Sequence, residues 1–264
     1  MNWSDYSPRR YSRHALSVAI LLAVIVAASW LCEVNLSDLI KGFSKGLSML
    51  GFFFPPDWSA FSEMLQPALV TIVICLVATP IGATVSILFG LAGARNIAPP
   101  WLRLSSRSLI AVERGLPEIV ILLLLVAAFG LGPFAGMMAL AIGSIGMLGK
   151  LVADAIEEID ARVLDSVAAV GATRWQVIRH AVLPEILPSL VANSIFRFEV
   201  NIRASVLLGA IGAGGIGYEL NAAINQLEYS RATVAALISL LLVFLSERGA
   251  DYLRAKILTS RSLA

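Results

Sequence analysis

The segment that decides the fold, residues 154–188, reads DAIEEIDARVLDSVAAVGATRWQVIRHAVLPEILP. It is the longest polar, charged stretch of the chain, and very apolar sequence flanks it on both sides. Val163, Val167 and Val170 are spaced to share one face of a short helix. Gly171 predicts the end of that helix, because helices commonly end at glycine. The first half of the segment is therefore a short amphipathic helix followed by a turn.

A second short helix is predicted to begin at Thr173. Residues 173–176 have the S/T-x-x-E/Q form of a capping box, which satisfies free N–H groups at a helix start. Pro184 and Pro188 are predicted to interrupt or redirect the chain after this helix. The apolar face of the helix consists of three residues at helical spacing: Trp175, Ile178 and Val182.

The composition indicates an integral membrane protein. Of the 264 residues, 58% are hydrophobic and 14% are charged, and the mean hydropathy is +0.83. A soluble globular chain is about half apolar and about a quarter charged. In such a protein an amphipathic pair of helices needs a surface to dock on, so we expect residues 154–188 to bind a partner protein at the membrane surface.

Uncharged runs predict six membrane-spanning helices and an all-α fold. Residues 15–32 carry no charge, which suits a first span. A signal peptide is the alternative, since a basic start precedes the run, but the run is long and no A-x-A-like site follows. A helix at 36–47 is predicted to lie at the membrane interface. The other five spans are predicted at residues 64–94, 108–129, 134–152, 186–210 and 232–247.

The third span is the least regular of the six. Residues 95–107 are predicted to be a loop, and the turn FGLGPF (129–134) is predicted to end the third helix. The uncharged run at 119–149 is too short for two complete spans. The third helix must therefore begin near Ser108 and carry charges into the membrane.

The distribution of lysine and arginine predicts the orientation. With six spans both termini lie on one side, and that side receives 14 of these residues against three on the other. Cytoplasmic loops carry the excess of positive charge. The termini and residues 154–188 are therefore expected in the cytoplasm of a bacterial cell, below its inner membrane. The predicted organisation is a cytoplasmic N-terminus at 1–14, a first span with an external amphipathic segment at 15–63, a core at 64–253 and a cytoplasmic tail at 254–264.

The fifth span carries charges near mid-membrane, where each costs at least about 2.5 kcal/mol on insertion scales and usually faces an interior pathway. Arg197 favours a pathway for a small anion, whereas Glu199 and Arg203, as i, i+4 neighbours, favour a structural ion pair. A structural network with charges of the third span is the alternative for all of them. The candidate pathway residues are seven: Arg197, Glu199, Asn201, Arg203, Glu113, Arg114 and Glu118.

Two glycine motifs do not predict a nucleotide site. Residues 212–217 match G-x-G-x-x-G, but no strand precedes them, so we expect a turn at the outer mouth formed by Gly212, Gly214, Gly215 and Gly217. Gly149-Lys150 lacks the rest of a Walker A motif. Neither a catalytic triad, a metal-ligand cluster nor a nucleic-acid motif is predicted. We expect no cofactor on this chain and no metal.

Residues 154–188 resemble the "EAA" loop of ABC-importer permeases, whose pattern is E-A-A, three residues, G, nine residues, I-x-L-P. Asp165-Ser166-Val167 stands in the E-A-A place, Gly171 matches, Ala181 replaces the isoleucine and Leu183-Pro184 matches. Further stretches are similar to the phosphonate-transporter branch of these permeases: FFPPDWS (53–59), VAAFGLGPFAG (126–136), FRFEVNIRASVLLG (196–209) and IGAGGIG (211–217).

The resemblance implies a type I importer permease that forms a homodimer in the lipid bilayer. It implies two ABC ATPase subunits on the cytoplasmic side, which use ATP and Mg²⁺, and an extracytoplasmic substrate-binding protein. Trp175 would fill a groove on the ATPase, and Asp165 with Arg174 or Arg179 would set the register. The residues expected to couple to the ATPase are seven: Asp165, Gly171, Thr173, Arg174, Trp175, Leu183 and Pro184.

The expected cargo is a phosphonate or a related oxyanion such as phosphite or phosphate. A methionine-type importer is an alternative, against which the arginines of the fifth span argue. A membrane enzyme acting on lipid phosphates would need an acid/base pair, for which Glu113 and Glu118 are the only candidates. A proton-driven secondary transporter working through Glu199 would not need residues 154–188.

Overall fold

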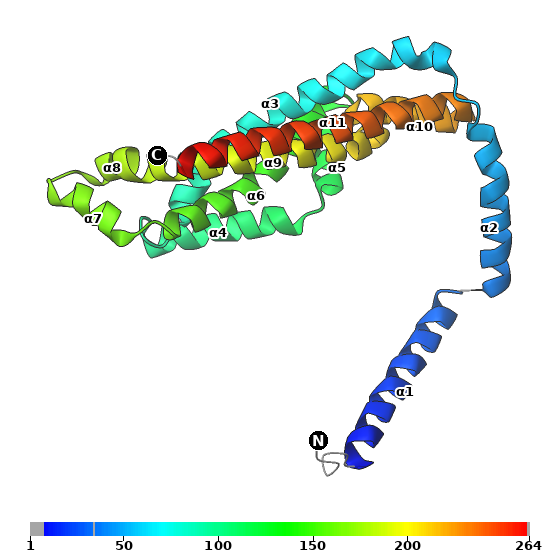
Figure 1. Cartoon of the computed structure of the whole chain (residues 1–264), viewed down its shortest axis with the longest axis horizontal. Helices are drawn as coiled ribbons and strands as arrows, with labels where there is room; N and C mark the ends of the chain where they lie inside the picture. The colour runs from blue at the N-terminus through cyan, green and yellow to red at the C-terminus, as the bar shows by residue number, and fades with distance from the viewer. Residues whose placement is uncertain (1–7, 34, 263–264) are drawn as a thin grey trace. The chain divides into compact units, whose positions relative to one another are not determined.

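The computed structural model describes residues 8–33 and 35–262, with the side chains of 14–33, 35 and 37–256. All regular elements in this part of the chain are helices (Figure 1). Residues 1–7 of the predicted N-terminal segment, residue 34, and residues 263–264 of the predicted tail lie outside it. The chain divides into two compact units, Met1–Phe54 and Pro55–Ala264. The predicted functional boundaries at residues 14, 63 and 253 stay predictions.

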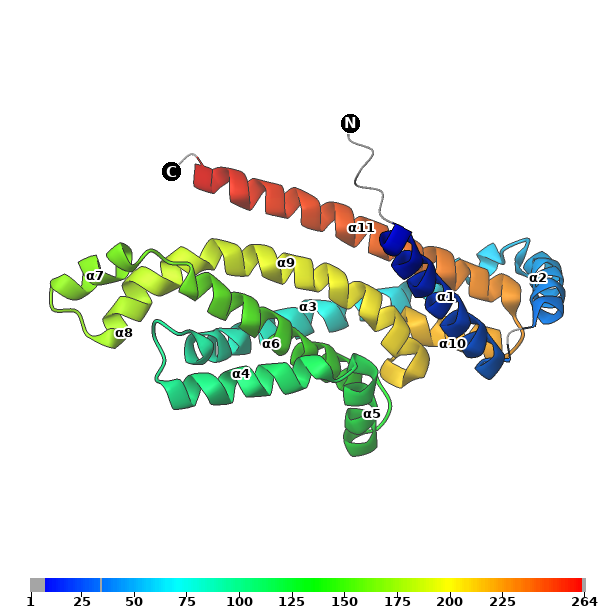
Figure 2. The same ribbon diagram turned by 90° about the horizontal axis from the view of Figure 1, so that it is seen from below.

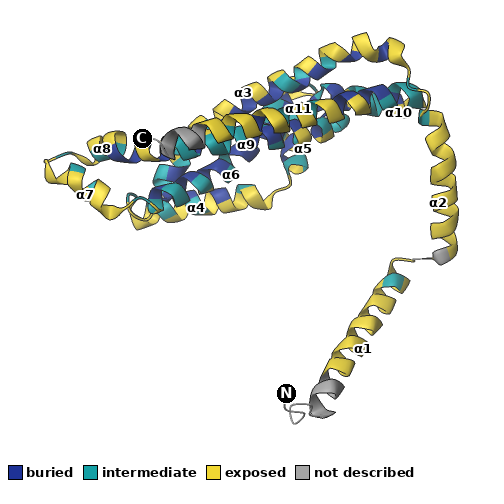
Figure 3. Ribbon diagram, in the orientation of Figure 1, coloured by how far each residue is buried: buried dark blue, intermediate teal, exposed yellow. Residues whose placement is uncertain are grey.

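The N-terminal unit contains two helices and a short 3₁₀ turn. α1 runs Pro8–Leu31 and covers most of the predicted first span at 15–32. α2 runs Leu36–Leu50 and contains the helix predicted at 36–47, and Gly51–Phe53 forms the 3₁₀ turn. The described side chains of both helices are almost all exposed, including the large apolar ones (Figure 3). An apolar helix of this length with no apolar partner is what a lipid-facing helix looks like outside its membrane.

The second unit is built on one central helix, α6 (Pro133–Glu157), which packs closely on α3 (Phe61–Gly93). Gly82 and Gly90 of α3 permit this approach, because a Cβ at Gly90 would lie 2.2 Å from Val152 Cγ1 of α6. Small residues bring membrane helices together in this way. The remaining helices of the unit are α4 (Pro100–Gly115), α5 (Glu118–Phe129), α7 (Ala161–Ala169), α8 (Arg174–Val177), α9 (Leu183–Leu208), α10 (Ile216–Asn225) and α11 (Tyr229–Ser262).

Five helical stretches in the described residues are long and apolar enough to cross a membrane. They are His14–Leu31, Trp58–Gly93, Pro133–Glu157, Arg174–Ala213 and Tyr229–Lys256. A sixth apolar helix, Glu118–Phe129, has 12 residues and is too short to cross alone. The number of apolar helices therefore agrees with the six predicted, and the short one is the irregular third span.

The prediction of one continuous third helix from Ser108 is wrong. α4 already begins at Pro100, because proline is well suited to the first turn of a helix, so Arg103 and Arg107 are helical. The helix then breaks at Leu116, whose φ of −90° and ψ of 127° are extended, since the residue before a proline is pushed out of the α region. α5 starts after Pro117 and runs at a steep angle to α4 (Figure 2).

The predicted interruption at Pro184 and Pro188 is also wrong. α8 continues through a π-helical turn, Ile178–Val182, directly into α9. Pro184 lies in the first turn of α9, and the π turn before it changes the hydrogen-bond pattern where the proline lacks an N–H. Pro188 is accommodated inside α9. The second amphipathic helix and the fifth span are thus one continuous helical stretch.

Candidate functional site

The coupling turn, residues 160–177, is shaped by local hydrogen bonds. Asp160 caps α7 by accepting from the Arg162 N–H at 2.9 Å, and the guanidinium of Arg162 lowers the pKa of the Asp160 carboxyl. Gly171 has φ +80°, which a residue with a Cβ rarely adopts. Thr173 and Gln176 form the predicted capping box, in which the Thr173 N–H donates to Gln176 Oε1 at 2.7 Å. The predicted helix–turn–helix is confirmed.

The coupling turn leaves apolar side chains in the open. Val170 is 83% exposed and Trp175 is 65% exposed. α7 and α8 project from one end of the unit, and the α3–α4 loop lies at the same end (Figure 1). Asp165 and Arg174 line a groove of about 530 Å³ between the coupling turn and residues 95–99 of that loop. The turn therefore presents an apolar and charged surface that the described part of the chain does not cover.

The floor of the groove is fixed to the membrane helices. The Arg95 N–H donates to Glu157 Oε1 at 2.7 Å, and Arg107 Nη2 donates to the same oxygen at 2.5 Å. Val182 and Ile186, at the start of the long helix, are buried in a cluster with Val152 and Ile156 of α6. Leu183 packs on that cluster, and Pro184 is exposed. The start of α9 is therefore anchored to α6 directly beside the coupling turn.

Arg197 lies in the middle of the unit and is only 4% exposed. Its Nε donates to Ser144 Oγ at 3.0 Å on α6, and its Nη2 forms an ion pair with Glu118 Oε1 at 2.6 Å on α5. Gly143 makes room for this pair, since a Cβ there would lie 2.8 Å from Arg197 Nη2 and 2.9 Å from Glu118 Oε1. Arg197 therefore cross-links α9 to both α6 and α5.

Arg197, Ser144 and Glu118 form a polar layer, and Asn201 extends this layer by one helical turn along α9. Its side chain is fully buried, and its Nδ2 donates to Thr79 Oγ1 of α3 at 2.9 Å and to Ser144 Oγ at 3.1 Å. Asn201 Oδ1 has no hydrogen-bond partner among the described residues. Neither Thr79 nor Ser144 is predicted from the sequence, because a small hydroxyl inside an apolar run is a weak signal.

Glu199 and Arg203 belong to a second network, on the side of α9 that faces α11. Glu199 is buried and forms ion pairs with Arg203 and with Arg254 Nη2, the latter at 3.4 Å. Arg203 also lies 3.7 Å from Glu247 Oε2. Since the sequence placed residue 254 in a tail, it did not predict that Arg254 reaches α9.

Glu113 and Arg114, at the end of α4, are neighbours in sequence but lie in different surroundings. Glu113 Oε2 is buried against α6, where a Cβ at Gly146 would come within 1.3 Å of it, and it has no hydrogen-bond partner among the described residues. Arg114 is exposed. The seven predicted pathway residues therefore fall into four settings. The polar layer contains Arg197, Glu118 and Asn201, and a second network contains Glu199 and Arg203. Glu113 Oε2 is buried against α6, and Arg114 is exposed at the helix break.

The glycine-rich turn forms at the opposite end from the coupling turn. Gly212, Gly214 and Gly215 have positive φ angles of 115°, 76° and 74°. Gly212 accepts a hydrogen bond from the Gly132 N–H of the α5–α6 turn at 2.8 Å. The Ile216 N–H donates to Thr71 Oγ1 of α3 at 2.9 Å. Gly217 packs against the backbone of Val206, leaving no room for a Cβ. The four glycines thus close a tight turn.

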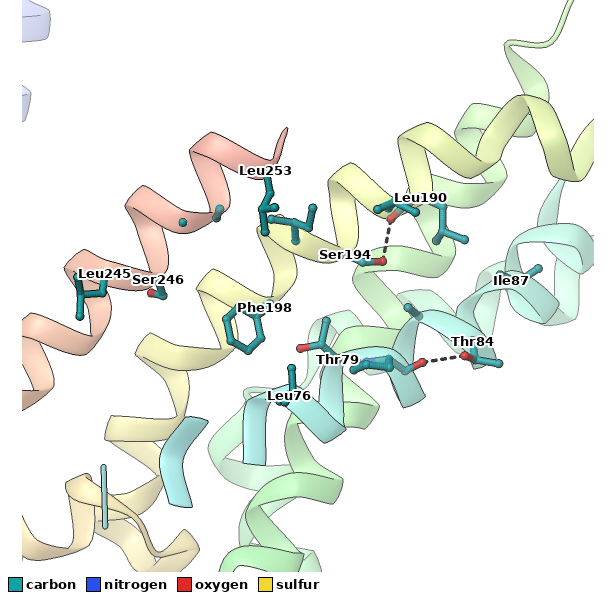
Figure 4. A pocket seen from close by; sticks show the side chains of 16 residues that line it. Leu76, Thr79, Thr84, Ile87, Leu190, Ser194, Phe198, Leu245, Ser246 and Leu253 are labelled. Atoms are coloured by element: carbon teal, nitrogen blue, oxygen red, sulfur yellow. Dashed lines mark hydrogen bonds between the residues drawn. The ribbon is translucent and has the colours of Figure 1, made fainter. Parts of the chain in front are cut away.

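A groove between three membrane helices does not suit an anion. It has a volume of about 620 Å³ and lies between α3, α9 and α11, lined mostly by apolar residues such as Leu76, Phe198 and Leu253 (Figure 4). The hydroxyl groups that line it already donate hydrogen bonds, each to a backbone carbonyl of its own helix. These hydroxyls belong to Thr79, Thr84, Ser194 and Ser246.

No metal-ligating cluster of three or more histidine, cysteine or acidic residues occurs within the described part of the chain.

The family described as "Binding-protein-dependent transport system inner membrane component" matches residues 86–259. A phosphate-import permease protein of Mycolicibacterium smegmatis is 39% identical over 94% of this chain, which spans 47% of that relative's length. A phosphite transport system permease protein of Stutzerimonas stutzeri is 34% identical over 90% of this chain and 87% of its own length.

Among solved structures, one titled as inward-facing conformations of a methionine ABC transporter matches 76% of this chain and 99% of its own, with a TM-score of 0.64 and 22% identity. At that level of identity the likeness shows the fold, which is that of a type I ABC importer permease.

Proposed function

The chain belongs to the family of binding-protein-dependent transport system inner membrane components, and from that premise we propose that it is the transmembrane permease subunit of an ATP-driven importer for phosphonates or related phosphorus oxyanions. The observation that carries this proposal is the coupling turn. It is a locally stabilised helix–turn–helix in which Trp175 and Val170 are exposed and accessible to a partner protein. It is also continuous with the membrane helix that contains Arg197.

In this proposal ATP is hydrolysed by partner subunits and not by this chain. Two partner ATPase subunits dock on the coupling turns of two copies of this chain in the cytoplasm, with Trp175 in a groove of each ATPase. Asp165 and Arg174, which both face the groove beside residues 95–99, set the register of docking. The buried contacts of Val182 and Ile186 with α6 support transmission of the movement, which switches the cavity between inward-open and outward-open states.

The cargo is proposed from two lines of support. The relatives that match most of this chain are named for phosphate and phosphite transport. The membrane-embedded arginines suit an anion. A methionine importer is the second candidate, because a probable D-methionine permease protein of Pasteurella multocida is 30% identical, but over only 55% of this chain. The family name favours a binding-protein-dependent transporter over the lipid-phosphate enzyme and the proton-driven transporter.

Uptake into vesicles tests the function. The permease, its ATPase and its binding protein are reconstituted together, and accumulation of methylphosphonate, phosphite, phosphate and methionine is measured with ATP supplied on the cytoplasmic face. We expect accumulation of at least one phosphorus oxyanion that requires both ATP and the binding protein, and none of methionine. Accumulation of methionine alone, or of an oxyanion without ATP, would contradict the proposal.

A further inference from the structure

Three arginines remain when the charges at the two predicted membrane surfaces are set aside. The distribution predicted from the sequence assigns 17 of the 20 lysines and arginines to one surface or the other. The other three are Arg114, Arg197 and Arg203. Each brings a guanidinium to a part of the chain where an unpaired charge is costly. How each charge is balanced therefore distinguishes their roles.

Two of these arginines are neutralised within the chain. Arg197 pairs with Glu118, and Arg203 pairs with Glu199 and approaches Glu247. Arg114 differs, because it has no ion pair and no side-chain hydrogen bond to any described residue. The adjacent carboxylate of Glu113 interacts with it electrostatically but turns toward α6, beyond ion-pair distance. Arg114 is thus the arginine of the three with an available charge.

The depth of Arg114 follows from its contact with α6. A Cβ built on Gly146 would lie 3.1 Å from Arg114 Cγ, so the stem of this side chain lies beside Gly146. Gly146 is the fourteenth of the 25 residues of α6, a helix long enough to cross the bilayer. An arginine exposed to lipid at the bilayer centre costs about 2.5–3.5 kcal/mol even on the mildest scales. Arg114 is therefore expected to face an aqueous cavity.

The helix break places Arg114 where membrane transporters bind charged cargo. α4 ends at Gly115 and α5 begins at Glu118, so the spanning segment is discontinuous at the depth of the polar layer. Discontinuous helices direct their ends at substrate near the membrane midplane. The C-terminal end of α4 stabilises the charge of Arg114 by only about 0.3–1 kcal/mol, which leaves that charge able to attract an anion.

We propose that the guanidinium of Arg114 binds the oxyanion as it crosses the membrane midplane, whereas the Arg197–Glu118 pair is a structural cross-link. This inference rests on the proposed function, because it requires an anionic cargo. A two-fold symmetric pair of subunits presents the same side chain twice. Two copies of Arg114 would then bracket a dianion such as phosphite or a phosphonate, and bidentate hydrogen bonds from a guanidinium suit such an oxyanion.

The test uses the complete transporter in vesicles, with phosphite, methylphosphonate and phosphate as probes. Arg114→Gln is expected to lower the maximal uptake rate at least about tenfold, because it removes the charge-assisted hydrogen bonds of the guanidinium from both copies. ATP hydrolysis stimulated by the loaded binding protein is expected to stay within about twofold of the unmodified transporter, because the coupling turn is untouched. Arg114→Lys, which keeps the charge without the planar fork, should retain an intermediate uptake rate.

Arg103→Gln is the matched control, since it removes the same charge from the same helix three turns earlier, and it should leave both rates unchanged. Unchanged uptake by Arg114→Gln would overturn the inference. Equal loss of uptake and ATP hydrolysis by both Arg114 variants would also overturn it, because that result indicates a structural role or a contact between copies. If the unmodified transporter moves no oxyanion but moves another solute, the proposed function itself fails.

Discussion

Arg197 and Trp175 lie on the same continuous helical stretch, Arg174–Ala213, and their surroundings are opposite. The charged Arg197 is buried and is satisfied by Glu118 and Ser144, while the apolar Trp175 is exposed. A buried charge without a partner costs several kcal/mol, so Arg197 is matched within its own chain. An exposed tryptophan at a turn with its own capping box costs the fold little, and it remains available to a second protein.

Internal cross-linking and the surface proposed for partner binding thus lie at different positions along one helical stretch. The polar layer around Arg197 holds α5, α6 and α9 together from inside. The coupling turn around Trp175 holds its own shape through Asp160, Gly171 and Thr173 and has little packing above it. Substitutions in the two regions should therefore separate loss of folding from loss of partner binding.

The largest effect is expected at the buried cross-link. Arg197→Met leaves the Glu118 carboxylate without its partner, and breaking a buried pair in this way costs about 3–5 kcal/mol. We expect a lower unfolding midpoint and a lower yield of folded permease, measured by thermal unfolding in detergent. Adding Glu118→Gln should recover part of the loss, since the unpaired charge is removed. A midpoint equal to that of the unmodified chain would show that the pair is not important for stability.

A smaller effect, and one without loss of folding, is expected at the coupling turn. Trp175→Asp replaces an exposed aromatic anchor, and such residues contribute about 2 kcal/mol or more at interfaces, roughly 30-fold in affinity. The ATPase should no longer co-purify with the permease, while the unfolding midpoint of the permease alone stays unchanged. Val163→Asp, on the other helix of the turn, is the comparison variant. Retention of the ATPase by Trp175→Asp would refute its docking role.

The smallest effect concerns the cap of α7 and depends on pH. The folded-state pKa of Asp160 lies below its ordinary value of 3.8 because of Arg162, so folding favours the charged carboxylate. The cap is therefore fully present above pH 3.8 and is lost as the pH falls through the lower folded-state pKa. Hydrogen exchange of the segment containing Arg162, corrected for the intrinsic rate, should show protection that falls in this range. Asp160→Asn keeps an acceptor and should abolish that pH dependence.

Several features of this protein follow from local sequence alone. The uncharged runs predict the apolar helices, because a span must satisfy its backbone within itself and present apolar side chains to lipid. Residues 173–176 predict the start of α8, and Gly171 predicts the turn before it, since both depend on groups a few residues apart. The charges of residues 197–203 also mark this part of the fifth span as a polar region within an apolar helix.

The tertiary structure decides which of these groups meet. Glu113 and Glu118 stand five residues apart, one on each side of Pro117. Glu118 pairs with Arg197, whereas Glu113 Oε2 lies against Gly146 with no hydrogen-bond partner among the described residues. Ser144 accepts hydrogen bonds from Arg197 and Asn201, and Thr79 accepts one from Asn201, only because α3, α6 and α9 pack together. Hydrogen bonds and ion pairs depend on distances of about 3 Å between segments far apart in sequence, and helix packing sets those distances.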